Sequence, residues 1–156
     1  MAHASNYVPS PICDHPVPWV EFHHSVPSRV AEIAPVVDRL MSLIRTGRRA
    51  DGSEVDIEIA LGEALMNAVV HGNHEAPEKT VDVTCRCGAD GAVDITIRDQ
   101  GDGFDWQAVT DPTLPENIHR AHGRGIYLMR RLMDEVWFGR GGSVVCIRKK
   151  PNSRWA

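Results

Sequence analysis

Residues 56–72, DIEIALGEALMNAVVHG, constrain the fold of this chain more than any other stretch. At about 100° per residue, the apolar side chains of this segment cover nearly the whole circumference of a helical wheel. A helix of that kind is normally buried on all sides, so we expect it at the centre of the fold. Its broad apolar face holds Ile57, Leu61, Ala64, Leu65, Ala68 and Val69, and Ile59, Met66 and Val70 extend the apolar cover around the back.

Asp56, Glu63 and Asn67 fall on one narrow polar stripe of the same helix. Glu63 and Asn67 are four residues apart and therefore point the same way. Burying a carboxylate without a partner costs several kcal/mol, so Glu63 needs either a partner or a hydrated cleft. Taken alone, the segment leaves two interpretations open. The two side chains form a buried pair bonded to the backbone, or they line a cleft in which Glu63 is a base and Asn67 holds a metal ion.

Composition points to one soluble domain. A chain of 156 residues suffices for a single hydrophobic core, and 42% hydrophobic with 24% charged residues is ordinary for a globular protein. The net charge of −4 gives no reason to expect nucleic acid or an anionic membrane as a partner. No apolar run approaches the roughly 18 residues of a membrane helix, and no signal-peptide pattern is present. We expect a cytoplasmic domain at residues 18–150 between tails at residues 1–17 and 151–156.

The four cysteines are unevenly spaced and do not suggest a disulfide framework. Cys85 and Cys87 lie on one face of a predicted strand, and no second ligand pair has zinc spacing. We therefore predict that both thiols belong to the hydrophobic core.

Periodicity predicts five strands and three helices. Alternating apolar residues indicate strands at residues 18–26, 79–87, 92–99, 136–140 and 143–149. Two further helices are expected, one from an N-cap at Ser28 to about Thr46 and one at residues 125–134. Pro35 either kinks the first of these or marks its first turn. The predicted buried stripe of that helix holds Ile33, Val36, Val37, Leu40, Leu43 and Ile44.

Because most of the connections are hairpins, we predict an α/β (α+β) fold. It is a two-layer sandwich, with a mixed, mostly antiparallel sheet of about five strands and three helices on one face.

Two glycine motifs follow the polar stripe. Asp99, Gly101 and Gly103 end a strand, where a buried carboxylate facing an apolar pocket can accept a hydrogen bond from an exocyclic amine such as that of adenine. The same pattern is also common as a plain strand-to-turn connection. The loop at residues 104–123 that follows is long enough to be either functional or disordered.

Gly123, Arg124 and Gly125 open the last predicted helix. The N–H groups at a helix N-terminus bind phosphate oxygens, and glycine gives a ligand access to them. Alone, this motif could equally be a loop that stops before a helix. Together with the Glu63–Asn67 pair and the long loop between the glycine motifs, it supports a ligand site.

These segments resemble a known family. ALGEALMNAVVHGN, IRDQGDGFD and GRGIYLMRRLMDEV look like the three boxes of the ATPase superfamily shared by gyrase, histidine kinases and heat-shock chaperones, which has the Bergerat ATP-binding fold. Within it, the sequence is similar to the anti-sigma-factor serine/threonine kinases of bacterial partner-switching systems. The loop sequence DPTLPEN and the ending MDEV resemble the same subgroup.

The resemblance implies roles for three polar residues. Glu63 matches the general base that acts on the attacking hydroxyl. Asn67 matches the ligand of the Mg²⁺ that is bound to the ATP phosphates. Asp99 matches the residue that recognises the adenine amino group. A single asparagine is a poor magnesium site, so we expect the ion to bind only together with ATP.

The resemblance also assigns the glycines. Gly101 and Gly103 match the residues that begin the ATP lid, and Gly123 and Gly125 match those whose backbone cradles phosphate. Arg124 lies between the last two, where its position and charge suggest a phosphate contact.

The implied function is a cytoplasmic kinase for a STAS-domain anti-sigma-factor antagonist, which also sequesters a sigma factor and forms a homodimer through its N-terminal strand and helix. The alternative is a nucleotide-responsive anti-sigma binding module with little or no kinase activity. A third possibility, a histidine-kinase catalytic fragment, fits the N-terminal strand and helix less well.

Overall fold

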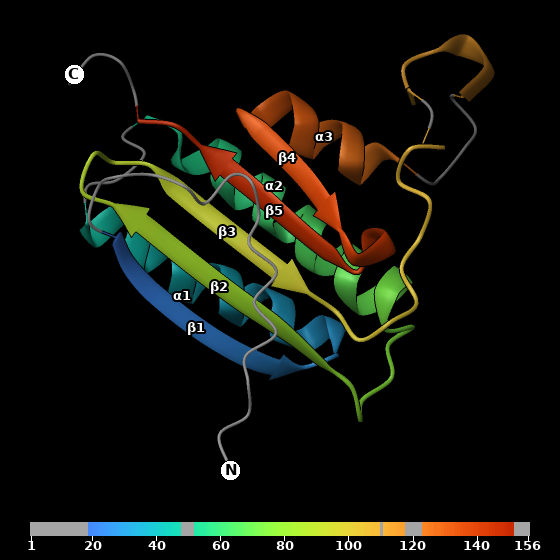
Figure 1. Ribbon diagram of the computed structural model, residues 1–156, viewed down its shortest axis with the longest axis horizontal. Coiled ribbons are helices and arrows are strands. Elements are labelled where there is room, and N and C mark those ends of the chain that lie inside the picture. The colour runs from blue at the N-terminus through green and yellow to red at the C-terminus, as the bar shows by residue number, and fades with distance from the viewer. Residues whose placement is uncertain (1–18, 48–51, 110, 118–122, 152–156) are drawn as a thin grey trace.

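The five strands form one antiparallel sheet in the order β1-β2-β3-β5-β4 (Figure 1). The computed structural model describes residues 19–47, 52–109, 111–117 and 123–151. The tail predicted at residues 1–17 lies outside these ranges, as does the tail predicted at 151–156 apart from Pro151. The strands are β1 (Trp19–Pro27), β2 (Thr80–Gly88), β3 (Val93–Arg98), β4 (Glu135–Gly139) and β5 (Val144–Lys149).

Three helices pack on one face of this sheet and lie behind it in Figure 1. They are α1 (Ile33–Thr46), α2 (Glu54–Met66) and α3 (Arg124–Leu132), with α2 between the other two. The predicted two-layer α+β sandwich is therefore confirmed, and its sheet is antiparallel throughout. None of the described helices is long and apolar enough to cross a bilayer.

The predicted core faces of the central strands are confirmed. Alternate residues of β2 and β3 point toward the helices and are buried, because strand side chains alternate between the two faces of a sheet. Cys85 and Cys87 belong to this layer, with their Sγ atoms 3.9 Å apart and not bonded. The buried set is Val81, Val83, Cys85, Cys87, Val93, Ile95 and Ile97.

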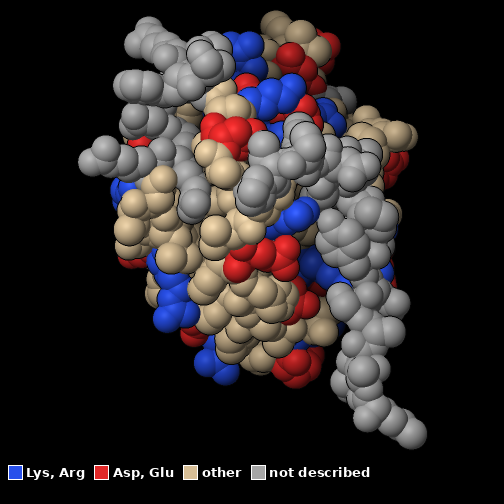
Figure 2. Space-filling view, turned by 60° about the vertical axis from the view of Figure 1, so that its left-hand side comes forward, with Lys and Arg blue, Asp and Glu red and all other residues tan. Residues whose placement is uncertain are grey.

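The opposite face of the sheet holds a buried ion pair. Arg148 of β5 donates from Nε and from one terminal nitrogen to the two carboxylate oxygens of Asp94 on β3, each at 2.5 Å. Both side chains are at most 5% exposed. On the surface shown in Figure 2, described basic and acidic side chains are interspersed, and neither sign of charge forms a continuous patch.

Two details of the α1 prediction are wrong. Leu43 is 42% exposed and Met41 is buried, because the stripe that faces the sheet is centred between Leu40 and Met41. Ser28 is not an N-cap: it is buried, and its Oγ has no hydrogen-bond partner within the described part of the chain. A 3₁₀ turn (Val30–Glu32) precedes α1, so Pro35 lies in the first turn, where its missing N–H leaves no helical hydrogen bond unmade.

The prediction for the central helix is half correct. All six residues of its predicted broad face are buried. The back of the helix is partly buried at only one position: Ile59 and Met66 are 42% and 39% exposed, whereas Val70 is partly buried against the core. No helix or strand of the described residues covers this side of α2, so it remains at their surface.

The α-helical part of this segment also ends earlier than predicted. Residues Asn67–Gly72 form a π turn, and the N–H of Asn73 donates to the carbonyl of Ala68, five residues back, at 2.9 Å. Such turns widen a helix and occur frequently at functional sites. Here the turn lies beside the end of β3.

Candidate functional site

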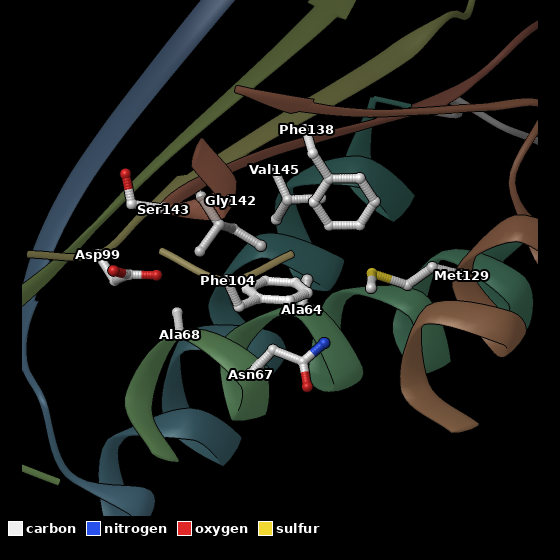
Figure 3. A pocket seen from close by; sticks show the side chains of 11 residues that line it. Ala64, Asn67, Ala68, Asp99, Phe104, Met129, Phe138, Gly142, Ser143 and Val145 are labelled. Carbon is white, nitrogen blue, oxygen red and sulfur yellow. The ribbon is translucent and has the colours of Figure 1, made fainter. Parts of the chain in front are cut away.

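A narrow pocket lies between the sheet and the helices beside the end of β3 (Figure 3). Its walls come from α2, α3, the three strands β3, β4 and β5, and the loop that follows β3. Most of the lining is apolar, and the polar side chains of Asp99, Asn67 and Ser143 interrupt it. The lining residues are Ala64, Asn67, Ala68, Ile97, Asp99, Phe104, Met129, Phe138, Gly142, Ser143 and Val145.

Asp99 is held at the closed end of this pocket by backbone contacts. Its N–H donates to the Ser143 carbonyl at 2.9 Å, and its Oδ1 accepts the N–H of Gly101 at 2.8 Å. A β-carbon at Gly72 would overlap the Asp99 carboxylate, and one at Gly101 would overlap the Gly72 carbonyl. Both glycines are therefore needed to fit the carboxylate in this position.

The buried position changes the acidity of Asp99. Burial raises the pKa of its carboxyl above the usual 3.8, since the charged form loses hydration. The hydrogen bond from Gly101 and the positive charges of Lys79 and His74 oppose that shift. Asp99 thus presents an acceptor to the pocket from a largely dry environment.

Glu63 and Asn67 meet α3 at its N-terminal turn. A β-carbon at Gly125 would lie 2.6 Å from Glu63 Oε2 and 3.6 Å from Asn67 Nδ2. Figure 3 shows Asn67 extending from the end of α2 on the side of α3. A carboxylate at the N-terminus of a helix is favoured by the helix dipole and its unpaired N–H groups. Both side chains are only partly buried, and Asn67 but not Glu63 lines the pocket, so the structure does not show a buried pair.

Gly123 directly precedes α3. It is the N-cap residue, and its φ of +98° lies in the left-handed region that favours glycine. Arg124, the first residue of the helix, is exposed. The sequence motif therefore begins a helix whose first turn lies beside Glu63 and Asn67.

The loop after β3 is fastened to the turn between β4 and β5. Gly103 has φ +80°, and a β-carbon there would overlap the carbonyl of Gly141. The N–H of Phe104 donates to that same carbonyl at 2.8 Å. A β-carbon at Gly142 would lie 2.8 Å from the Phe104 nitrogen, so these glycines allow the two segments to touch.

Phe104 then turns its ring into the pocket (Figure 3). It packs edge-on against Phe138 at 5.9 Å between ring centroids, and Trp106 stacks on Phe138 at 5.3 Å. With Phe104 in this position, the enclosed part of the pocket measures about 10 Å³, the space of about one water molecule.

Comparison with known proteins places this site in a family. The model of the histidine kinase-like ATPase domain matches residues 26–149. The anti-sigma F factor of Geobacillus kaustophilus is 31% identical over 72% of this chain and 68% of its own length. The chain therefore belongs to the histidine kinase-like ATPase family, in its anti-sigma-factor kinase branch.

Further relatives of this ATPase domain agree. The anti-sigma F factor of Heyndrickxia coagulans is 35% identical over 69% of this chain and 65% of its own length. The serine-protein kinase RsbW of Staphylococcus epidermidis is 39% identical over 56% of this chain and 61% of its own. The chain thus spans slightly less than two-thirds of the length of these two relatives.

A solved histidine kinase domain from Erythrobacter litoralis EL346 has a similar fold. Its TM-score is 0.51 at 19% identity, and the match covers 83% of this chain and 63% of that one. This likeness is one of fold alone.

Asn73 holds the candidate site together and was not predicted from the sequence. Asn73 is fully buried, its Nδ2 donates to the Thr80 carbonyl at 3.0 Å, and its Oδ1 accepts the N–H of Gln100 at 2.8 Å. It ties the π turn to the start of β2 and to the residue after Asp99. The only signal was its place as the last residue of the segment ALGEALMNAVVHGN, where an asparagine after a glycine indicates an ordinary turn.

Ser143 was missed as well. It is 8% exposed, lines the pocket and donates from Oγ to the Arg140 carbonyl at 3.1 Å. From the sequence, Ser143 was predicted only as the first residue of the strand at residues 143–149. Only the pairing of β5 beside β3 brings it next to Asp99.

Proposed function

We propose that this protein is a cytoplasmic, Mg²⁺-dependent serine/threonine kinase that transfers phosphate from ATP to a STAS-domain anti-sigma-factor antagonist. We further propose that it sequesters a sigma factor. The names of the relatives support this proposal. The observation that carries it is the closeness of Glu63 and Asn67 to Gly125 in the N-terminal turn of α3.

Asp99 is proposed to bind adenine. Its carboxylate is an acceptor in a largely apolar pocket, and an exocyclic amine is a donor of matching chemistry. Gly72 and Gly101 support this role because a β-carbon at either position would disturb the place that the Asp99 carboxylate occupies. Phe104 has to move for a base to enter, which makes Gly101 and Gly103 the start of a mobile lid in this proposal.

The phosphates are proposed to lie at the N-terminus of α3. Gly123 and Gly125 place no side chain over the N–H groups of this turn, and Arg124 adds a positive charge beside them. Arg124 is exposed, so its side chain can reach a phosphate without being buried.

The residues fit a magnesium ion that arrives with the nucleotide. No group of three His, Cys, Asp or Glu side chains among the described residues could hold a metal ion by itself. Mg²⁺ usually takes one or two protein oxygens and completes its shell with phosphates and water, which suits Asn67 Oδ1. When bound, the ion neutralises charge on the phosphates.

Glu63 is proposed to accept the proton of the attacking hydroxyl. As the hydroxyl oxygen bonds to the γ-phosphorus, the bond from that phosphorus to the leaving ADP oxygen breaks. A carboxylate next to the phosphate site is placed to take the proton and to orient the hydroxyl. An amide at the same position could accept a hydrogen bond from the hydroxyl but could not take its proton.

The proposed homodimer uses β1 and the start of α1. β1 is an edge strand of the sheet, and Val20 and Val30 are 61% and 44% exposed. An exposed edge and apolar side chains are both features of an interface. A monomeric mass by light scattering at micromolar concentration would contradict this part of the proposal.

The second candidate is a nucleotide-responsive anti-sigma module with little or no kinase activity. The observation in its favour is Phe104, which lines the narrow pocket and follows Gly103, so nucleotide entry would be coupled to the position of the lid. Such a module would bind ATP and change its affinity for a sigma factor without transferring phosphate.

Calorimetry with Mg²⁺–ATP tests the site. Wild type should bind, and Asp99→Asn should lose at least about tenfold in affinity because the amide presents a donor or a weaker acceptor to the adenine amine. Asp38→Asn, the same change on the exposed surface of α1, is the matched control and should bind like wild type. Equal binding by Asp99→Asn would remove the adenine assignment.

Phosphoryl transfer then separates the two candidates. Wild type should phosphorylate a purified STAS-domain antagonist, and Glu63→Gln should still bind ATP but transfer roughly 10²- to 10⁴-fold more slowly. If wild type binds ATP and antagonist but transfers nothing, the binding-module function is the correct one.

A further inference from the structure

An apolar stripe runs along the outer side of α2. Val55, Ile59, Gly62 and Met66 are spaced at i, i+4, i+7 and i+11 and therefore share one face of the helix. The three side chains are 67%, 42% and 39% exposed. A run of this kind on a helix that already buries its other face has no role in the core described above.

Gly62 makes a hollow in the middle of this stripe. A β-carbon there would meet nothing within 4 Å, so no described neighbour requires a glycine. Glycine is also less favourable than alanine in a helix interior. The absence of a side chain is thus explained neither by helix propensity nor by packing within the described structure, and it suits the close approach of another molecule.

The hollow has the geometry of a hole in helix packing. Such a hole is formed by four residues at i, i+3, i+4 and i+7 and receives one side chain from a facing helix. Ile59, Gly62, Glu63 and Met66 have this spacing. Two apolar side chains form its ends, glycine gives it depth, and the carboxylate that meets Gly125 forms its rim.

We propose that this hole is the docking point for the protein that receives the phosphoryl group, and that the acceptor inserts an apolar side chain from a helix there. This inference rests on the proposed function, since Glu63 at the rim is the base of that proposal. An acceptor whose hydroxyl reaches Glu63 has to contact this side of α2. The docking point at Gly62 and the proposed base Glu63 then lie on the same turn of α2.

Charge indicates what surrounds the inserted side chain. α2 carries Glu54, Asp56, Glu58 and Glu63 and no basic residue. Asp56 and Glu58 form ion pairs with Lys149 and Arg45, at 3.2 and 2.9 Å, which draws these two away from a partner. Lysine or arginine beside the apolar side chain of the acceptor would therefore complement the remaining carboxylates.

A second copy of this chain fits the hole less well. A two-fold contact centred on Gly62 would bring the Glu63 carboxylates of two copies together, and like charges across an interface are unfavourable. The patch of three exposed side chains is also far smaller than the roughly 800 Å² per partner of a stable interface. A small patch suits a substrate that binds and leaves.

Filling the hole tests this inference. Gly62→Leu places a side chain in open space, so the fold and Mg²⁺–ATP affinity should be unchanged. Binding of a purified STAS-domain antagonist, measured by calorimetry, should weaken at least about tenfold, and KM for it should rise with little change in kcat. Ser42→Leu adds the same side chain to an exposed position of α1 and should bind the antagonist normally. Met66→Gln, which removes only apolar character, should weaken binding as well.

The outcomes are distinct. Normal antagonist binding by Gly62→Leu overturns the docking site, and transfer by that variant would leave the proposed kinase intact. Binding by wild type without transfer, still lost in Gly62→Leu, retains the docking site and removes the kinase activity. No binding by wild type removes both. Loss of a wild-type dimer in Gly62→Leu by light scattering would assign the hole to a second copy and overturn the inference.

Discussion

Glu63 and Gly125 lie against each other where α2 meets α3, so closely that a β-carbon on Gly125 would sit 2.6 Å from Glu63 Oε2. No ordinary β-carbon tolerates that separation. The glycine therefore fixes how near the carboxylate comes to the N-terminal turn of α3. Two residues that are 62 positions apart in the sequence together define the distance between the proposed base and the proposed phosphate site.

Gly125→Ala should reduce phosphoryl transfer roughly 100-fold while leaving the protein folded. The methyl group displaces Glu63, and a shift of about 1 Å in a catalytic group can cost that much. Steady-state transfer to the antagonist and a thermal melt measure the two effects. An unchanged transfer rate would mean that the carboxylate position is not critical.

Gly62→Ala is the matched stability control for that variant. It makes the same change in the neighbouring helix, where a β-carbon meets nothing within 4 Å. We expect the free energy of unfolding to rise by about 0.5–1 kcal/mol, because alanine loses less backbone entropy in a helix. Chemical denaturation checks this value, and destabilisation would show that the helix is strained at Gly62.

Asp99 should make stability depend on pH. Burial raises its pKa in the folded protein, so its contribution is fully present below the usual value of 3.8 and is lost as pH rises through the folded pKa. Asp99→Asn removes the titrating group, so the variant does not lose this stability as pH rises. The free energy of unfolding of the variant, relative to wild type, should therefore increase as pH rises above about 4.

Asp111→Asn should change the free energy of unfolding with pH in the opposite direction to Asp99→Asn. Hydrogen bonds from the side chain and the backbone of Thr113 lower the pKa of Asp111, so this carboxylate stabilises the fold above pH 3.8 and ceases to do so as pH falls. Relative to wild type, the variant should become less stable as pH rises. Denaturant titrations of both variants at several pH values measure the two slopes, and slopes of equal sign would contradict the assignment.

Asp94→Ala should destabilise the fold by about 3–5 kcal/mol, because it leaves Arg148 charged and buried without its main partner. Urea denaturation measures the loss. Glu58→Ala breaks the exposed pair with Arg45 and should cost less than about 1 kcal/mol. Replacing Asp94 and Arg148 together by apolar residues should be milder than either single change.

Mg²⁺–ATP should change tryptophan fluorescence through Trp106. This ring stacks on Phe138, which lines the pocket together with Phe104, so moving Phe104 alters the surroundings of Trp106. Trp106→Phe should abolish most of the change and still bind ATP in calorimetry. A signal that survives in this variant would mean that the aromatic cluster stays in place when nucleotide binds.

Local sequence signals were sufficient for the element order and for the buried side of β2 and β3. Alternation in β2 and β3 identified the core face, and the turn glycines identified the hairpins. Both signals depend only on backbone geometry and residue type over a few positions, so they do not require knowledge of the neighbours. The position of Pro35 remained open for the same reason, since it depends on where α1 begins.

Errors arose where a neighbour decides the outcome. Ile59 and Met66 read as buried because the helical wheel is apolar almost all round, but exposure depends on whether a second layer covers α2. Leu43 was predicted to be buried and is exposed, whereas Met41 is buried, because the angle at which α1 packs on the sheet decides which of its residues face the sheet. Asn73 and Ser143 were overlooked since their partners belong to other strands.

The sequence by itself determined the α+β sandwich and the three motifs, and it selected Glu63, Asn67 and Asp99 as candidate site residues, because periodicity and motif spacing are properties of short segments. Only the tertiary structure decided that Glu63 meets Gly125, that Gly72 makes room for Asp99, and that Phe104 lines the pocket. These are contacts between elements distant in sequence. They follow from how side chains exclude one another in three dimensions, which no local pattern encodes.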